Sequence, residues 1–135
     1  MNASVTVTFD ENTRGDDLTI AAAHEGKHVS DAQGLATALT ADMANGGVNA
    51  TAGPTNRTWY EREVRAYTVS ASVAQGLGLP NVSIGNHEIW NNGWRAADRS
   101  RLQANGIDNV LRTSRNYRWN NQGLSPQNPG PRYIP

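Results

Sequence analysis

The chain has 135 residues, no cysteine and a formal net charge of zero. This length is typical of one domain with a single core, and no run of about 18 apolar residues is available to cross a bilayer. Without cysteine there is no disulfide, no thiolate ligand and no cysteine nucleophile, so a metal site must use His, Asp and Glu. We therefore expect a soluble single domain without a membrane span.

The charges are distributed unevenly along the chain. Residues 1–56 carry two basic and seven acidic groups, whereas residues 57–135 carry ten arginines and five acidic groups. Arginines interleaved with aromatic residues would suit a nucleic-acid or partner-binding face. The aromatic residues concerned are Trp90, Trp94, Tyr117 and Trp119. We favour the simpler interpretation, a solvated helix face that carries arginines, and we do not expect nucleic acid as the partner.

Polar and apolar residues alternate from Ser4 to Phe9, which predicts an edge strand with one buried face. The same segment lacks the basic and apolar stretches of a secretory signal, so export would need another route or a larger precursor. Asp16 or Asp17 can cap a following helix that extends from about Leu18 to Gln33.

A second, alanine-rich helix is expected over residues 35–45, followed by a loop over residues 48–56. Thr58 and Glu61 then match a capping box, in which each side chain satisfies a free backbone N–H of the other residue. This pair predicts the start of a long helix over residues 58–76.

The remainder of the chain is predicted to form short elements. Residues 82–84 predict a strand, and two helices are expected over residues 94–105 and 108–117, separated by a glycine. The last segment holds four prolines and is expected to be extended, docked or disordered. We therefore divide the chain into a domain over residues 1–122 and a proline-rich tail over residues 123–135.

The helix expected over residues 18–33 contains an HExxH motif that begins at His24 and ends at His28. On a helix, this i, i+4 spacing places both imidazoles on one face, where they can bind the same metal ion. Imidazole nitrogens suit Zn²⁺, which lowers the pKa of a bound water to about 7. Glu25 lies about 100° around the helix from His24 and can accept the water proton as a general base.

Two surface histidines beside a glutamate on an ordinary amphipathic helix would need no metal. Gly26 favours the metal interpretation, because a glycine inside a helix costs about 1 kcal/mol and suggests the close approach of another element or of a substrate. We therefore predict a zinc site on this helix.

A catalytic zinc needs a third protein ligand and an open position for water. The metzincin arrangement, with a third histidine six residues after His28, is excluded because that position is Gly34. The remaining arrangement takes a glutamate from a later helix, either Glu61 or Glu63. Glu61 is already the capping-box carboxylate, whereas Glu63 shares a helix face with Tyr67 and the apolar stripe, so we favour Glu63.

The segments HEGKHVSDA (24–32) and EREVRAYTVSA (61–71) resemble the metallopeptidase toxin domains that end bacterial RHS-repeat and other polymorphic-toxin or secreted effector proteins. In such gluzincin-like domains, a helix with Glu-x-x-Ala-Tyr or a similar motif follows HExxH, and its glutamate completes the site. The corresponding residues here are 63–67, so the resemblance supports Glu63 as the third ligand. It covers residues 16–77 and implies a protein or peptide substrate and a cognate immunity or inhibitor protein.

Four further residues have candidate roles near the site. Asp31 could orient a ligand imidazole by accepting its second N–H, or could be a solvated helical residue. His87, Tyr67 or Tyr60 could donate a hydrogen bond to the oxyanion of a tetrahedral intermediate. A loop histidine and a core tyrosine are the simpler interpretations of His87 and Tyr67.

These features together predict a helix-dominated α+β, zincin-like domain that hydrolyses peptide bonds with Zn²⁺. Zincin domains usually have several strands before HExxH, and only one is predicted here, so the sheet is minimal or the chain is a fragment. We expect the peptide substrate to add as a strand along Val5–Phe9. Two alternatives stay open: a binding or toxin module whose metal is structural or absent, and nucleic-acid binding by the arginine-rich C-terminal half. The predicted site consists of the ligands His24, His28 and Glu63 and the base Glu25.

Overall fold

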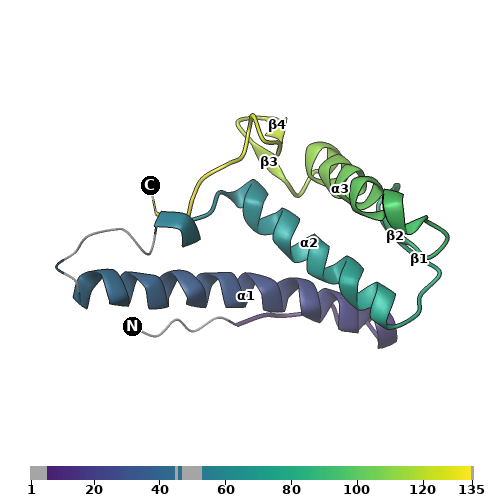
Figure 1. Ribbon diagram of the computed structural model, residues 1–135, viewed down its shortest axis with the longest axis horizontal. Coiled ribbons are helices and arrows are strands. Elements are labelled where there is room, and N and C mark those ends of the chain that lie inside the picture. The colour runs from purple at the N-terminus through teal and green to yellow at the C-terminus, as the bar shows by residue number, and fades with distance from the viewer. Residues whose placement is uncertain (1–5, 45, 47–52, 135) are drawn as a thin grey trace.

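The computed structural model describes residues 6–44, 46 and 53–134. Three helices dominate the described chain: α1 (Gly15–Ala44), α2 (Trp59–Gly76) and α3 (Ala96–Thr113), with a short 3-10 turn η1 (Gly53–Thr55) before α2. Two antiparallel strand pairs complete it: β1 (Asn81–Ile84) with β2 (His87–Asn91), and β3 (Arg118–Trp119) with β4 (Gln122–Gly123). Helix α2 crosses α1 and lies between α1 and α3 (Figure 1). The predicted helix-dominated α+β fold is confirmed.

Helix α1 is longer than predicted, because the two helices expected on either side of Gly34 are one. A Cβ at Gly34 would meet no atom within 4 Å, so nothing forces the helix to end there. Beyond the glycine, Leu35 and Ala38 are buried and pack with Tyr133 of the tail. This burial offsets the helix cost of a glycine, which is about 1 kcal/mol.

The segment before α1 forms no strand over residues 6–10, and Ser4 and Val5 lie outside the described residues. The edge strand predicted over residues 4–9 is therefore wrong for residues 6–9. A segment with alternating polar and apolar residues forms a strand only when another strand pairs with it. Both strand pairs of the described chain are formed by other segments. Asp16 and Asp17 lie in the first turn of α1, not at its cap, and there they face the positive end of the helix dipole.

Helix α2 begins as predicted. The Thr58 hydroxyl accepts a hydrogen bond from the Glu61 backbone N–H at 3.2 Å, and the Glu61 carboxylate accepts one from the Thr58 N–H at 3.4 Å. The loop expected before it over residues 48–56 contains η1 at its described end, and residues 48–52 lie outside the described residues. Helix α2 buries small side chains that let its neighbours approach closely: Ala66, Ala71 and Ala74.

The main apolar core lies between α2, α3 and the β1–β2 hairpin. Strand β1 contains the predicted residues 82–84, whereas β2 was not predicted. Helix α1 contributes Ile20 to this core. The fully buried large side chains are Ile89, Ile107, Val110, Leu111 and Leu124.

Helix α3 corrects the prediction of two helices over residues 94–105 and 108–117. Gly106 lies inside it, and a Cβ there would be 1.8 Å from the backbone carbonyl oxygen of Glu88 on β2. The glycine therefore allows β2 to approach the helix and does not end it. Among the described residues, no helix is both long enough and apolar enough to cross a bilayer, as expected.

The tail returns to the start of α2 (Figure 1). Asn56 exchanges two hydrogen bonds with the backbone of Ile134, at 2.8 and 3.0 Å. The Arg62 guanidinium lies 4.1 Å from the centre of the Tyr133 ring. Of the three states expected for the tail, the docked state is the one found for residues 123–134.

Candidate metal centre

The three side chains predicted as metal ligands meet between α1 and α2. The Nε2 atoms of His24 and His28 are 3.2 Å apart. The Glu63 carboxylate places Oε2 3.2 Å from His24 Nε2 and Oε1 3.0 Å from His28 Nε2. Nitrogen and oxygen ligands about 2.0–2.2 Å from a tetrahedral zinc are about 3.3–3.6 Å from one another. The donor types and their mutual spacing therefore fit a zinc ion.

The periodicity of both helices brings the two imidazoles and the carboxylate together. His24 and His28 are one turn apart on α1, and Glu63 begins a buried i, i+4, i+7 stripe on α2 that continues with Tyr67 and Ser70. Glu61, the other candidate ligand, is exposed and stays in the capping box. The choice between the two glutamates thus follows from the face of α2 that packs on α1.

His24 and Glu63 are buried, His28 is partly buried, and the three groups are electrostatically coupled. Burial alone would raise the pKa of Glu63, but the adjacent imidazoles lower it to about 2. Burial alone would lower the pKa of His28, but Glu63, together with the charge of Glu25, raises it above 6.5. His24 Nδ1 is buried without a hydrogen-bond partner among the described residues. Because a buried carboxylate is costly unless a positive charge is close to it, a cation bound by Glu63 and the two imidazoles would be stabilising.

A cleft of about 740 Å³ is lined by His24, whereas His28 and Glu63 do not line it. His24 and Glu25 line it from α1, Tyr67 and Ser70 line it from α2, and all four residues of β1 line it as well. The carboxylate of Glu25 is not among the three grouped ligands, and its charge adds to the effect of Glu63 in raising the pKa of His28. Glu25 is partly exposed and opens to the cleft.

Two tyrosines adjoin the metal ligands. The Tyr67 ring packs edge-on against His24, with centroids 4.3 Å apart, and its hydroxyl is 2.7 Å from that of Tyr117. Burial raises the pKa of both tyrosines, and the negative charges of Glu63 and Glu25 add to the effect. Both hydroxyls therefore stay protonated at neutral pH. One hydroxyl donates its proton to the hydrogen bond between them, and the proton of the other hydroxyl is not part of that bond.

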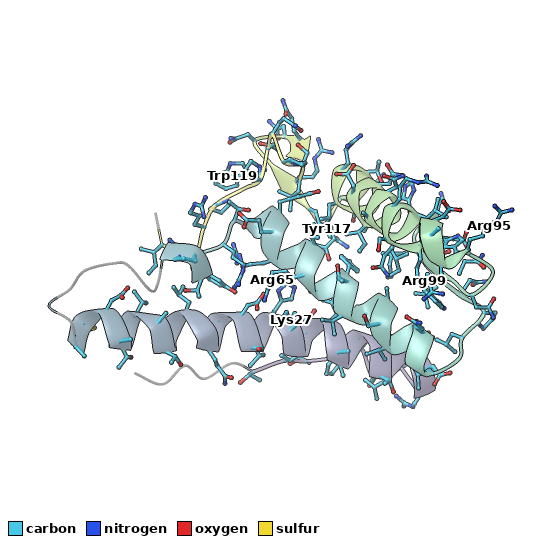
Figure 2. All side chains as sticks on the ribbon, viewed as in Figure 1. Lys27, Arg65, Arg95, Arg99, Tyr117 and Trp119 are labelled. Carbon is cyan, nitrogen blue, oxygen red and sulfur yellow. The ribbon has the colours of Figure 1, made fainter. Side chains whose placement is uncertain are left out.

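Tyr117 was not predicted as a site residue. It follows α3, is separated from Tyr67 by 50 positions in the sequence and lines the cleft. Figure 2 shows it between α2 and α3. No local pattern marks such a residue, because only the packing of α3 on α2 brings it to the cleft.

Asp31 does not orient an imidazole and is not solvated. Its carboxylate accepts two hydrogen bonds from Arg65, at 2.8 and 2.9 Å, and Lys27 and Arg57 lie 3.6 and 3.8 Å from it. Burial would raise the pKa of Asp31, but Arg65 and then Lys27 and Arg57 lower it. Lys27 and Arg65 lie in the space between α1 and α2 (Figure 2). Asp31 therefore joins α1 to α2 one turn beyond His28.

The two other candidate oxyanion donors lie away from the cleft. His87 Nε2 is 3.2 Å from the Thr113 hydroxyl, and the Tyr60 hydroxyl donates to Asp108 at 3.2 Å. Neither His87 nor Tyr60 lines the cleft. The close approach of another element, one of the two expected at Gly26, is not found, since a Cβ there would meet no described atom within 4 Å.

Many of the C-terminal arginines have partners within the fold. Arg101 pairs with Asp98 at 3.3 Å, Arg112 pairs with Asp108, and the Arg99 guanidinium lies 5.1 Å from the centre of the Trp90 ring. Arg95, at the start of α3, points away from the body of the protein (Figure 2). These contacts give the arginines structural roles on and around α3.

Comparison of the chain with models of protein families, with curated proteins and with solved structures found no match. The resemblance to toxin metallopeptidases therefore depends on residues 24–32 and 61–71 themselves. A functional conclusion has to come from the geometry of the site.

Proposed function

We propose that this chain is a zinc-dependent peptidase domain of the kind that ends bacterial polymorphic toxins. The observation that carries the proposal is the cluster of His24, His28 and Glu63, in which the two Nε2 atoms are 3.2 Å apart and each lies 3.0–3.2 Å from one oxygen of the Glu63 carboxylate. His24 also lines a cleft. A ligand set of two histidines and one glutamate leaves one tetrahedral position open, as catalytic zinc sites do.

The residues around this cluster supply the other groups that peptide hydrolysis needs. Zn²⁺ bound there would act as a Lewis acid toward water and the peptide carbonyl. Glu25 accepts the proton of the attacking water and delivers it to the leaving amine. The hydroxyl pair of Tyr67 and Tyr117 donates a hydrogen bond to the oxygen that becomes negative in the transition state.

An extended peptide can be held by β1. In the described chain β1 pairs with β2 alone, and its four residues all line the cleft. Its outer edge therefore presents backbone groups to which a peptide can add as a further strand. This position replaces the strand addition along Val5–Phe9 that the alternating sequence suggested.

Hydrolysis of an unfolded protein such as casein by the zinc-loaded Glu25→Gln variant tests the proposal. Loss of the general base should lower the rate by about 10²–10⁴-fold while the zinc content stays unchanged. Glu88→Gln is the matched control, because Glu88 is an exposed glutamate of β2 that does not line the cleft. Undiminished hydrolysis by Glu25→Gln would contradict the role of Glu25. Absence of hydrolysis in the zinc-loaded wild type would favour a binding module.

A further inference from the structure

The backbone of the tail caps the helix that carries Glu63. The first N–H groups of a helix have no acceptor within the helix itself. In α2, the N–H of Trp59 donates to the carbonyl of Pro131 at 2.9 Å, and the N–H of Tyr60 donates to the carbonyl of Pro129 at 2.8 Å. The capping box satisfies the N–H that follows. The first turn of α2 is therefore completed by residues from the far end of the chain.

Tyr133 joins this same turn of α2 to α1. Its ring packs with the buried Leu35, which follows His28 by about two helical turns and so lies on the same face of α1. The Arg62 guanidinium lies 4.1 Å from the centre of the ring and donates to the tail backbone at 2.9 Å. Arg62 is the neighbour of Glu63 in the sequence. One side chain of the tail thus contacts both helices that carry the ligands.

The tail reaches Tyr133 in a restrained conformation. Pro129 and Pro131 have fixed φ angles, so ordering this segment costs less conformational entropy than ordering other residues. Gly130 lies between them with φ of 72°, and a Cβ there would be 3.0 Å from the Cβ of Trp59. The glycine therefore allows the tail to pack closely on the first turn of α2.

The placement of that first turn determines where the Glu63 carboxylate lies. Glu63 follows Trp59 by four residues, about one helical turn, and helical side chains lean toward the N-terminus of their helix. The tail reaches α2 at the open end of the angle between α1 and α2 (Figure 1). Ligand distances at a metal site tolerate an error of only about 0.2 Å. Small movements of α2 at this end would therefore separate Glu63 from His24 and His28.

We propose that the tail positions the metal site, with Tyr133 as the positioning residue that holds Glu63 of α2 beside the two histidines of α1. Ligands that are already in place bind a metal more tightly, because binding does not have to order them. The reference to a metal site rests on the proposed function. The role of Tyr133 concerns zinc affinity, however, and can be measured without hydrolysis.

Competition with a chromophoric chelator measures the zinc affinity of full-length variants. Tyr133→Ala removes the contacts with both helices and should raise the Kd for zinc about tenfold. Tyr133→Phe keeps the ring and should keep the affinity of the wild type. Ile107→Val is the control, because it weakens the packing of α3 far from the tail and should leave the Kd unchanged.

Co²⁺ in place of zinc adds a spectroscopic readout, because its visible absorption depends on the number and geometry of its ligands. The spectrum of Tyr133→Ala should shift toward that of Glu63→Ala, whereas Tyr133→Phe and Ile107→Val should keep the wild-type spectrum. If Tyr133 only stabilised the fold, neither the Kd of the folded protein nor the spectrum would change.

Hydrogen exchange in the wild type tests the coupling without any substitution. Coupling between two binding events is reciprocal, so bound zinc should hold the tail in its docked position. The amides of Trp59 and Tyr60 donate to tail carbonyls and should therefore exchange more slowly when zinc is bound. Unchanged exchange of these two amides would contradict the coupling, even if Tyr133→Ala fails to fold.

The outcomes separate this inference from the proposed function. Equal Kd values and cobalt spectra for the wild type and Tyr133→Ala would overturn the positioning role alone, and so would an equal loss of affinity in Ile107→Val. A wild type that binds neither zinc nor cobalt would overturn both the inference and the metal centre. Weaker zinc binding by Tyr133→Ala, combined with absent hydrolysis by the zinc-loaded wild type, would contradict the peptidase function alone.

Discussion

The two sides of α2 are held by different forces. On one side, α3 and the β1–β2 hairpin bury large apolar side chains completely, among them Ile89, Ile107 and Leu111. On the other side, the contact with α1 is centred on polar groups: the imidazoles with Glu63, and Asp31 with Arg65. We call these the apolar side and the polar side.

The two sides of α2 should therefore contribute differently to the stability of the protein. Apolar burial is nearly independent of pH and metal, so the apolar side can hold α2 in place under most conditions. Charged groups that converge in a buried region cost free energy unless a counter-ion or a metal joins them. The polar side is therefore the part of the molecule whose stability should respond to zinc, pH and single charge changes.

The largest effect that would sharpen this comparison is stabilisation by zinc. At a free zinc concentration 1,000 times the Kd, unfolding of the wild type should require about 4 kcal/mol more than in chelator. His24→Ala and Glu63→Ala should lose both the bound zinc, measured by metal analysis, and this increase in urea unfolding. Glu61→Ala should keep both, although loss of the capping box lowers the free energy of unfolding by about 1 kcal/mol. Loss of zinc in Glu61→Ala would contradict the assignment of Glu63.

The second effect is a pH dependence of the metal-free protein that belongs to the polar side. The pKa of Glu63 is lowered from 4.5, so its contribution is present above pH 4.5 and is lost as pH falls toward about 2. The pKa of His28 is raised from 6.5, so its contribution is complete below pH 6.5 and is lost as pH rises through the raised value. The free energy of unfolding lost in Glu63→Gln should therefore be greatest between about pH 4.5 and 6.5.

Urea unfolding of the wild type and of Glu63→Gln across this pH range in chelator provides the measurement. Asp31 is the internal control, because its lowered pKa is present in both proteins and cancels in the difference. A difference that does not change with pH would mean that Glu63 and His28 are not coupled in the metal-free protein.

The third effect compares two helix glycines, Gly106 on the apolar side and the exposed Gly26 of α1. Gly106→Ala would place a Cβ against the Glu88 carbonyl oxygen and should lower the free energy of unfolding by about 3 kcal/mol. Gly26→Ala has open space and should raise it by up to about 1 kcal/mol. Urea unfolding of both variants measures the pair. Equal effects would contradict the close contact between β2 and α3.

The smallest effect concerns the ion pair that joins α1 to α2. Asp31→Asn removes the negative charge and one of the two oxygens that accept from Arg65, which is itself part-exposed, so the expected loss is about 1–2 kcal/mol. Asp98→Asn, which breaks an exposed pair with Arg101, should change stability by less than about 0.5 kcal/mol. Thermal unfolding in chelator compares the two variants. A larger loss in Asp98→Asn than in Asp31→Asn would contradict the greater stabilisation expected from the buried ion pair.

The candidate site was more predictable than the fold around it. His24, His28 and Glu63 were chosen from the sequence, and the structure brings the three together. The spacing of HExxH and the capping box act within one or two helical turns, so a local pattern suffices to indicate them. Tyr117 and the cleft could not be predicted in this way, because they depend on contacts between segments far apart in the chain.

The errors in the predicted fold also come from contacts between segments far apart in the chain. Gly34 and Gly106 both suggested helix ends, yet α1 and α3 continue through them. A glycine costs a helix about 1 kcal/mol, which the packing of Leu35 or of β2 readily outweighs. The alternation of residues 4–9 likewise suggested a strand, but residues 6–9 have no partner to pair with.

The sequence by itself determined the start of α2 and the face of the helix on which His24 and His28 lie, and it favoured Glu63 over Glu61. Each of these follows from helical geometry and hydrogen bonding between residues a few positions apart. Only the tertiary structure decided that these groups stand 3.0–3.2 Å apart, that Asp31 binds Arg65, and that Tyr117 lines the cleft. Those distances arise from the packing of whole helices, which no short stretch of sequence encodes.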